Sequence, residues 1–169
     1  MYKFIPFFLF CVIVAAITFN DFSDRPSGEE VSIQLEKTYG NVKVSRILKI
    51  HDGDTFNVDI DNWPIIIGKN ISIRINNIDT PETTASNSKI RKLSQYATLE
   101  LEKMLKSASV IELRNLKRDK YFRINANVFV DNVDVGQKLI DMGLAKQYDG
   151  GRKSVWSSSD YDKFNKTVK

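Results

Sequence analysis

The sequence predicts a mainly β domain of the α+β class, a small barrel with helices packed on it, of OB-like architecture. Three observations predict it. Short, mostly alternating apolar stretches occupy residues 42–76, a helical period appears over 88–106, and strand-like stretches return over 110–130. With 169 residues, 42% of them hydrophobic and 27% charged, the chain suits one globular domain with additional terminal segments.

The N-terminal segment, residues 1–19, is predicted to be a signal peptide or an N-terminal anchor. Its apolar run, residues 4–19, is shorter than the ~20 residues of a comfortable membrane span, and Lys3 is its only charge. Small residues up to Ala16 favour cleavage there. We therefore expect a secreted or periplasmic protein, with a membrane-anchored, extracytoplasmic domain as the alternative. Cys11, the only cysteine, lies in this segment, so the cleaved protein could form no disulfide, catalytic thiolate or cysteine-bound zinc site.

A flexible linker is expected over residues 20–41, which are polar and rich in turn formers. The folded domain is predicted over residues 42–148. Its first strand, residues 42–50, mostly alternates, although Arg46 and Ile47 break the pattern. A turn at DGD leads into a second strand, residues 55–60.

The next strand is predicted over ISIRIN, residues 71–76, after Asp61 and Asn62 turn the chain into WPIIIG. Ile71, Ile73 and Ile75 share one face of this strand. The first part of the domain is therefore a meander of short, half-buried strands.

Two helices are predicted. Apolar residues recur every three or four positions between Ser88 and Lys106, as an amphipathic helix requires. A shorter helix is expected over residues 135–142, with Gly143 at its C-terminal cap. The last segment, residues 149–169, is Ser- and Lys-rich, and it is predicted to be weakly structured.

Acidic residues cluster at two strand ends, in DGDT (52–55) and in IDTPE (78–82). They could shape turns, bind a metal or carry acid–base chemistry. The first is not an EF-hand loop, because counting from Asp52 puts Asn57 and Trp63 where Gly and Glu are needed. Arg74 faces away from the isoleucine side of its strand, which leaves it without a visible structural role.

These motifs resemble the staphylococcal nuclease (thermonuclease) family over roughly residues 42–148. The matching segments keep the family's order and approximate spacing. They are DGDT, an arginine five residues before the aspartate of IDTPE, DKYFR at 119–123, and GLAKQY at 143–148. The resemblance implies a five-stranded OB-fold β-barrel with helices, and calcium-dependent cleavage of DNA and RNA to products with 3′-phosphates.

The resemblance also assigns site residues. It implies three calcium ligands, namely Asp54, Asp79 and the backbone carbonyl of Thr80. It implies three catalytic residues, namely Arg74, Glu82 and Arg123. Calcium takes oxygen ligands, a carboxylate can accept a proton from water, and paired arginines suit phosphate oxygens.

Substrate contacts are expected from Lys120, Tyr121 and Tyr148, with DNA and RNA, single-stranded or loosened, as the partners. Asp52 is expected to be a turn residue or to act indirectly. One departure concerns Phe122, which stands where the family's type member has glycine, so the approach of the neighbouring arginine could differ.

Other interpretations remain open at this point. The chain's net charge of +4 favours a polyanionic partner without requiring one. The single histidine, His51, invites a histidine mechanism, although Glu82 already suits the water-activating role. A non-catalytic OB-fold module for nucleic acid is the main alternative, but acidic turns would repel a polyanion unless a metal were present. A secreted calcium-binding adhesion protein would leave Arg74 and Arg123 unexplained.

Overall fold

The computed structural model describes residues 40–167, so the predicted signal peptide and most of the predicted linker lie outside the described residues. The strands are β1 (Val42–Lys43), β2 (Arg46–Ile50), β3 (Thr55–Asp59), β4 (Ile71–Ile75), β5 (Ile78–Asp79), β6 (Ile111–Arg118), β7 (Ile124–Val130), β8 (Val133–Asp134) and β9 (Lys146–Gln147). The helices are α2 (Ile65–Gly68), α3 (Ser88–Ser107), α4 (Val135–Asp141) and α5 (Ser158–Thr167). Among the described residues, no helix is long and apolar enough to cross a membrane.

The main sheet closes on itself through its first strand. Its order is β1-β6-β7-β4-β3-β2, so β1 and β2 stand at opposite ends of the order although they are consecutive in the chain. The change of partner occurs between two residues, because Val44 N donates to Ile111 O whereas Ser45 N donates to Asp59 O. The predicted strand over 42–50 is thus one strand divided between two neighbours, which confirms the OB-fold barrel.

The barrel interior is filled by the alternating apolar residues that predicted the strands. Phe56 and Val58 of β3 and Ile73 of β4 have no exposed surface, and Ile75 is 2% exposed. The register of β3 and β4 pairs Phe56 with Ile73, so these side chains meet inside. The predicted isoleucine face is therefore confirmed, and it directs Arg74 to the other side of the sheet.

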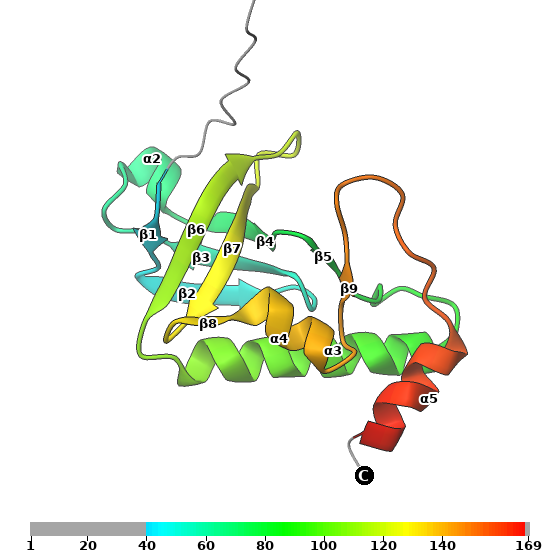
Figure 1. The fold of residues 1–169 in the computed structure, drawn as a ribbon. Helices are drawn as coiled ribbons and strands as arrows, with labels where there is room; N and C mark the ends of the chain where they lie inside the picture. The colour runs from blue at the N-terminus through cyan, green and yellow to red at the C-terminus, as the bar shows by residue number, and fades with distance from the viewer. Residues whose placement is uncertain (1–39, 168–169) are drawn as a thin grey trace, which may run out of the picture. The chain divides into compact units, whose positions relative to one another are not determined.

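Helix α3 runs along the barrel and covers its interior (Figure 1). It begins after Asn87, whose side chain accepts hydrogen bonds from the backbone N–H groups of Lys89 and Ile90. Its buried positions follow the predicted period, namely Leu93, Ser94, Ala97, Leu101 and Leu105. Helix α4 ends as predicted near Gly143, which has a φ of +71°.

The segment WPIIIG forms the short helix α2 at the surface. Ile65 is 80% exposed, Ile66 is 91% exposed and Ile67 is 49% exposed, so none of its three isoleucines belongs to the core. The apolar sequence alone would have placed them inside.

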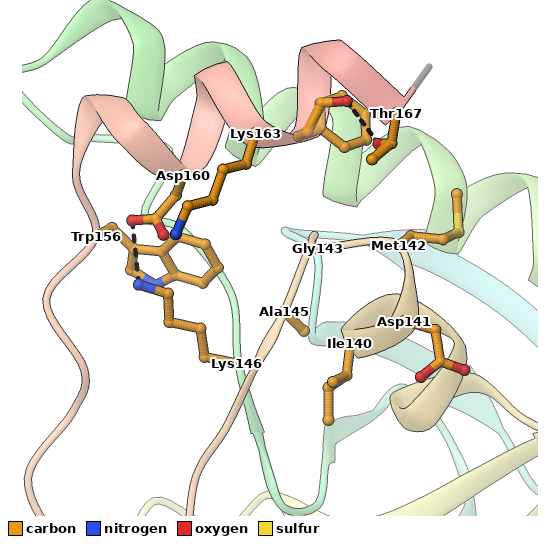
Figure 2. A pocket seen from close by; sticks show the side chains of 11 residues that line it. Ile140, Asp141, Met142, Gly143, Ala145, Lys146, Trp156, Asp160, Lys163 and Thr167 are labelled. Carbon is orange, nitrogen blue, oxygen red and sulfur yellow. Dashed lines mark hydrogen bonds and ion pairs between the residues drawn. The ribbon is translucent and has the colours of Figure 1, made fainter. Parts of the chain in front are cut away.

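The prediction of a weakly structured C-terminal segment is wrong for residues 158–167, which form α5 beside α3 (Figure 1). Phe164 anchors this helix, because it is 6% exposed and its ring centroid lies 5.0 Å from that of Tyr96. A cavity of about 220 Å³ lies between α5 and the turn after α4, and Lys146, Trp156 and Asp160 gather on one side of it (Figure 2). One buried aromatic residue in a polar segment was too weak a pattern to predict the helix.

Candidate active site

Asp54 is held at the end of the DGD turn between β2 and β3. Its backbone N–H donates to Asp52 Oδ1 (3.1 Å), which gives Asp52 the expected turn role. Gly53 lies so close to α3 that a Cβ there would come within 2.6 Å of the Ala97 Cβ. The turn therefore requires glycine, and close packing against α3 fixes the position of the Asp54 carboxylate.

The Asp54 carboxylate is buried, with only 6% of the residue exposed. Its Oδ2 accepts hydrogen bonds from the backbone N–H (3.2 Å) and the hydroxyl (3.0 Å) of Thr80, and its Oδ1 accepts one from the Thr55 hydroxyl (2.9 Å). Burial raises the pKa of Asp54 to about 6, although Arg74 and these hydroxyls act in the opposite direction. The protein therefore leaves part of this negative charge uncompensated.

Arg74 lies between two buried carboxylates. Its Nη1 is 3.0 Å from Asp54 Oδ2, and its Nη2 is 4.0 Å from Asp79 Oδ1. The same guanidinium donates to the carbonyl oxygens of Ile75 (3.1 Å) and Ile78 (3.0 Å), so it also braces the turn between β4 and β5. Arg74 thus has a structural role that its sequence position did not reveal.

Asp79 is 2% exposed at the end of β5, which pairs with β9. Its Oδ2 accepts a hydrogen bond from Trp156 Nε1 (3.2 Å), and its Oδ1 forms an ion pair with Lys153 Nζ (2.9 Å). Oδ1 receives no well-directed hydrogen bond within the described residues. A buried carboxylate oxygen of this kind is a suitable ligand for a cation.

Arg123 begins the return strand of the β6–β7 hairpin. Asp119 orients it, because Asp119 Oδ2 accepts from Arg123 Nε (2.8 Å) and Oδ1 accepts from the backbone N–H groups of Tyr121 and Arg123. Burial alone would raise the pKa of Asp119, but these hydrogen bonds outweigh burial and lower it. The Tyr121 ring centroid is 5.3 Å from Arg123 Cζ and 5.1 Å from Lys120 Nζ. The sequence interpretation gave Asp119 no role, although Asp119 is the first residue of the DKYFR motif.

One open groove of about 400 Å³ brings the candidate residues together. Eight of the nine predicted site residues line it, and the exception is Asp79. They are Asp54, Arg74, Thr80, Glu82, Lys120, Tyr121, Arg123 and Tyr148. Asp52, Thr55, Pro81 and Lys153 complete the lining, and His51 is not part of it. His51 instead lies with its Nε2 3.0 Å from Asn57 Oδ1, so its placement gives the histidine mechanism no support.

Lys153 is the main residue that the sequence interpretation missed. It lies between β9 and α5, and its ammonium is 2.8 Å from Glu82 Oε1 as well as close to Asp79. In a Ser- and Lys-rich segment, one lysine shows no pattern that separates it from solvated neighbours. Glu82 itself is an exposed side chain, so water can reach it.

The donor set for a metal is small. Within residues 40–167, no three His, Cys, Asp or Glu residues form a cluster that could hold an ion. The candidate ligands are instead two buried carboxylates, Asp54 and Asp79, with the backbone of Thr80 beside them. Two carboxylates and a carbonyl fit calcium, since this ion accepts irregular oxygen coordination and completes it with water.

Comparison with known proteins identifies the family of this chain. Residues 72–169 match the family described as staphylococcal nuclease homologue. The chain is 29% identical over 136 residues to a thermonuclease of Staphylococcus hyicus, an alignment that covers 80% of this chain and 73% of the relative. It is 33% identical over 113 residues to endonuclease YncB of Bacillus subtilis, which covers 66% of this chain and 49% of that relative. The chain belongs to the staphylococcal nuclease family.

Proposed function

We propose that the chain is a calcium-dependent nuclease that hydrolyses phosphodiester bonds of DNA and RNA and leaves 3′-phosphate ends. Its family and the nuclease names of two relatives support a nuclease function. The observation that carries the proposal is that Arg74, Glu82 and Arg123 line one groove with Asp54 and Thr80. Phosphate-binding cations, a proton acceptor and candidate metal ligands thus lie side by side.

The chain's own residues divide the chemistry among them. Glu82 is accessible to water and would accept the proton of the attacking water molecule. Arg74 and Arg123 present guanidinium groups to the same groove, where they would bind the phosphate oxygens and stabilise charge that develops in the transition state. Asp119 holds Arg123 in this orientation.

Asp54, Asp79 and the Thr80 carbonyl would hold the calcium ion. When bound, calcium supplies positive charge that polarises a phosphoryl oxygen and positions the reactants. Lys120, Tyr121 and Tyr148 lie along the groove, where they would contact the backbone or bases of an open strand.

The proposal is tested by incubating the purified protein with single-stranded DNA and, separately, RNA, with calcium, with magnesium or with a chelator. We expect cleavage to 3′-phosphate ends with calcium and much less with magnesium, which demands a tighter octahedron. Full activity in chelator would refute the proposed metal. Binding without cleavage in calcium would favour the non-catalytic module instead.

For localisation we propose secretion through a cleaved N-terminal segment. Cleavage after Ala16 would give a protein that begins at Ile17 with a net charge of +3, because Lys3 is the only charge lost from +4. N-terminal sequencing of the culture medium and the membrane fraction tests this. An intact N-terminus in the membrane fraction would indicate the anchor.

A further inference from the structure

Lys153 contacts two carboxylates that have different roles in the proposed reaction. Its ammonium lies 2.9 Å from Asp79 Oδ1, a candidate calcium ligand, and 2.8 Å from Glu82 Oε1, the candidate base. The Asp79 side chain is almost fully buried, whereas that of Glu82 is 63% exposed. Lys153 therefore links the groove to a buried carboxylate that does not itself line it.

The segment that carries Lys153 is anchored at its C-terminal side. Trp156 Nε1 donates to Asp79 Oδ2, and the Trp156 ring lies against Lys146, whose Nζ is 4.3 Å from the ring centroid. Lys146 also donates to Val155 O (3.0 Å) and pairs with Asp160 (3.1 Å), and Figure 2 shows these side chains together. These contacts limit how far the Lys153 backbone can move, so only the long side chain has to change its rotamer for the ammonium to approach or leave the two carboxylates.

Lys153 keeps its charge in this position. A lysine ammonium is charged at neutral pH, and the two carboxylates beside it favour that charged form. The groove thus contains a permanent cation of its own beside a buried carboxylate oxygen.

We propose that Lys153 competes with calcium for Asp79 and so sets the calcium affinity of the site. This inference rests on the proposed function, in which Asp79 is a ligand. Calcium binds carboxylate oxygens at roughly 2.3–2.6 Å. An ammonium 2.9 Å from the same oxygen would then lie against a divalent cation, so Lys153 has to withdraw when calcium binds.

The test measures calcium binding by isothermal titration calorimetry without nucleic acid, on the full chain. Lys153→Met removes the charge and keeps the length of the side chain, and Lys153→Gln provides a second neutral variant. Removing a cation beside a nearly buried carboxylate is expected to tighten calcium binding about 5-fold, near the upper end for exposed ion pairs. Lys153→Arg keeps the charge, so it is expected to bind calcium no more tightly than the unmodified protein.

The matched control is Lys106→Met. Lys106 pairs with Glu102 on α3, and neither residue lines the groove, so this variant loses the same charge away from the site. Its calcium affinity is expected to stay close to that of the unmodified protein. Equal or weaker affinity in both neutral Lys153 variants would overturn the inference, and so would equal tightening in Lys153→Arg. No calcium binding by the unmodified protein would instead refute the proposed metal, and the inference with it.

Discussion

Single residues of the candidate site differ in how much of the fold depends on them. Arg74 contacts two carboxylates and two backbone carbonyls, so its replacement affects structure and chemistry together. Glu82 is exposed, and its side chain is held by Lys153 alone among the residues for which a contact is described. Glu82 is therefore the residue at which chemistry can be tested with the least disturbance of the fold.

We expect Glu82→Gln to lower turnover by ~10²- to 10⁴-fold, the usual contribution of a positioned general base. Glutamine keeps the size of the side chain and its hydrogen-bonding reach but cannot accept a proton at neutral pH. Calcium and nucleic acid affinity are expected to change little. Steady-state cleavage of single-stranded DNA, with calorimetry for binding, checks both expectations.

Glu102→Gln on α3 is the matched control, since Glu102 does not line the groove, and its turnover is expected to be unchanged. Arg74→Lys is expected to be slow and also less stable, because lysine cannot keep the forked contacts of Arg74. If Glu82→Gln cleaved at the unmodified rate, another group would have to activate the water.

The buried carboxyl of Asp54 makes stability depend on pH. Its pKa in the fold is about 6, above the ordinary 3.8, so the carboxyl stabilises the fold below about pH 3.8 and loses that contribution as pH rises through about 6. As pH rises through this window, the unfolding free energy of the calcium-free protein is expected to fall by roughly 1–3 kcal/mol more than that of the Asp54→Asn variant. Urea unfolding in chelator at a series of pH values measures it. Parallel curves for the two proteins would mean that folding does not change the pKa of Asp54.

Among the elements, the β6–β7 hairpin contains a strained position. Phe122 has a φ of +64°, a left-handed conformation that glycine adopts readily and bulky residues rarely adopt. Its side chain is 77% exposed, with the Arg118 guanidinium 5.0 Å from the ring centroid, so little packing offsets the strain. The turn still places Arg123 in the lining of the groove.

Phe122→Gly is expected to stabilise the protein by about 0.5–1 kcal/mol, since relief of the left-handed strain exceeds glycine's greater loss of backbone freedom. Chemical denaturation followed by circular dichroism measures the difference. Phe122→Ala removes the ring but keeps the strain, so it is expected not to stabilise. Equal stabilisation by alanine would assign the effect to the exposed ring rather than to the backbone.

The elements show where sequence patterns were sufficient. Alternation predicted β3 and β4, and the helical period predicted α3, because in these segments one face is buried along the whole length. Helix α5 was missed because Phe164 is its only residue described as buried, and α2, whose apolar residues are exposed, was not predicted either. A hydrophobic pattern predicts a strand or helix only when one face of that strand or helix is buried regularly along its length.

For the whole molecule, the barrel brings distant segments into one site. Arg74, Glu82 and Arg123 come from separate parts of the chain, and their joint place in the groove was predictable only through the family motifs. Lys153 contacts Glu82 across 71 positions of sequence, a contact that depends on how α5 docks and that no local pattern records. The motif residues of the site were therefore predictable, whereas Lys153, the cation that pairs with its carboxylates, was not.

The groove's charge predicts a salt-dependent affinity. Lys120 lines the groove beside Arg74 and Arg123, so we expect Lys120→Gln to reduce the slope of log affinity against log salt for single-stranded DNA by about 1. Fluorescence anisotropy in a Glu82→Gln background measures binding without cleavage. Lys103→Gln on α3 removes an equal charge outside the groove, and a comparable change of slope in this control would refute a specific phosphate contact at Lys120.

The divided first strand has a consequence for the order of events during synthesis. Val42 pairs with Leu113, so the N-terminal half of this strand has no barrel partner until β6 has been made. The barrel of the nascent chain therefore cannot close before β6 has been synthesised, and such non-local pairing is slow. Until then the edge at β1 stays open to other chains, and unpaired edges of this kind promote aggregation. We expect the emerging chain to be most vulnerable to misassociation shortly before this seam closes.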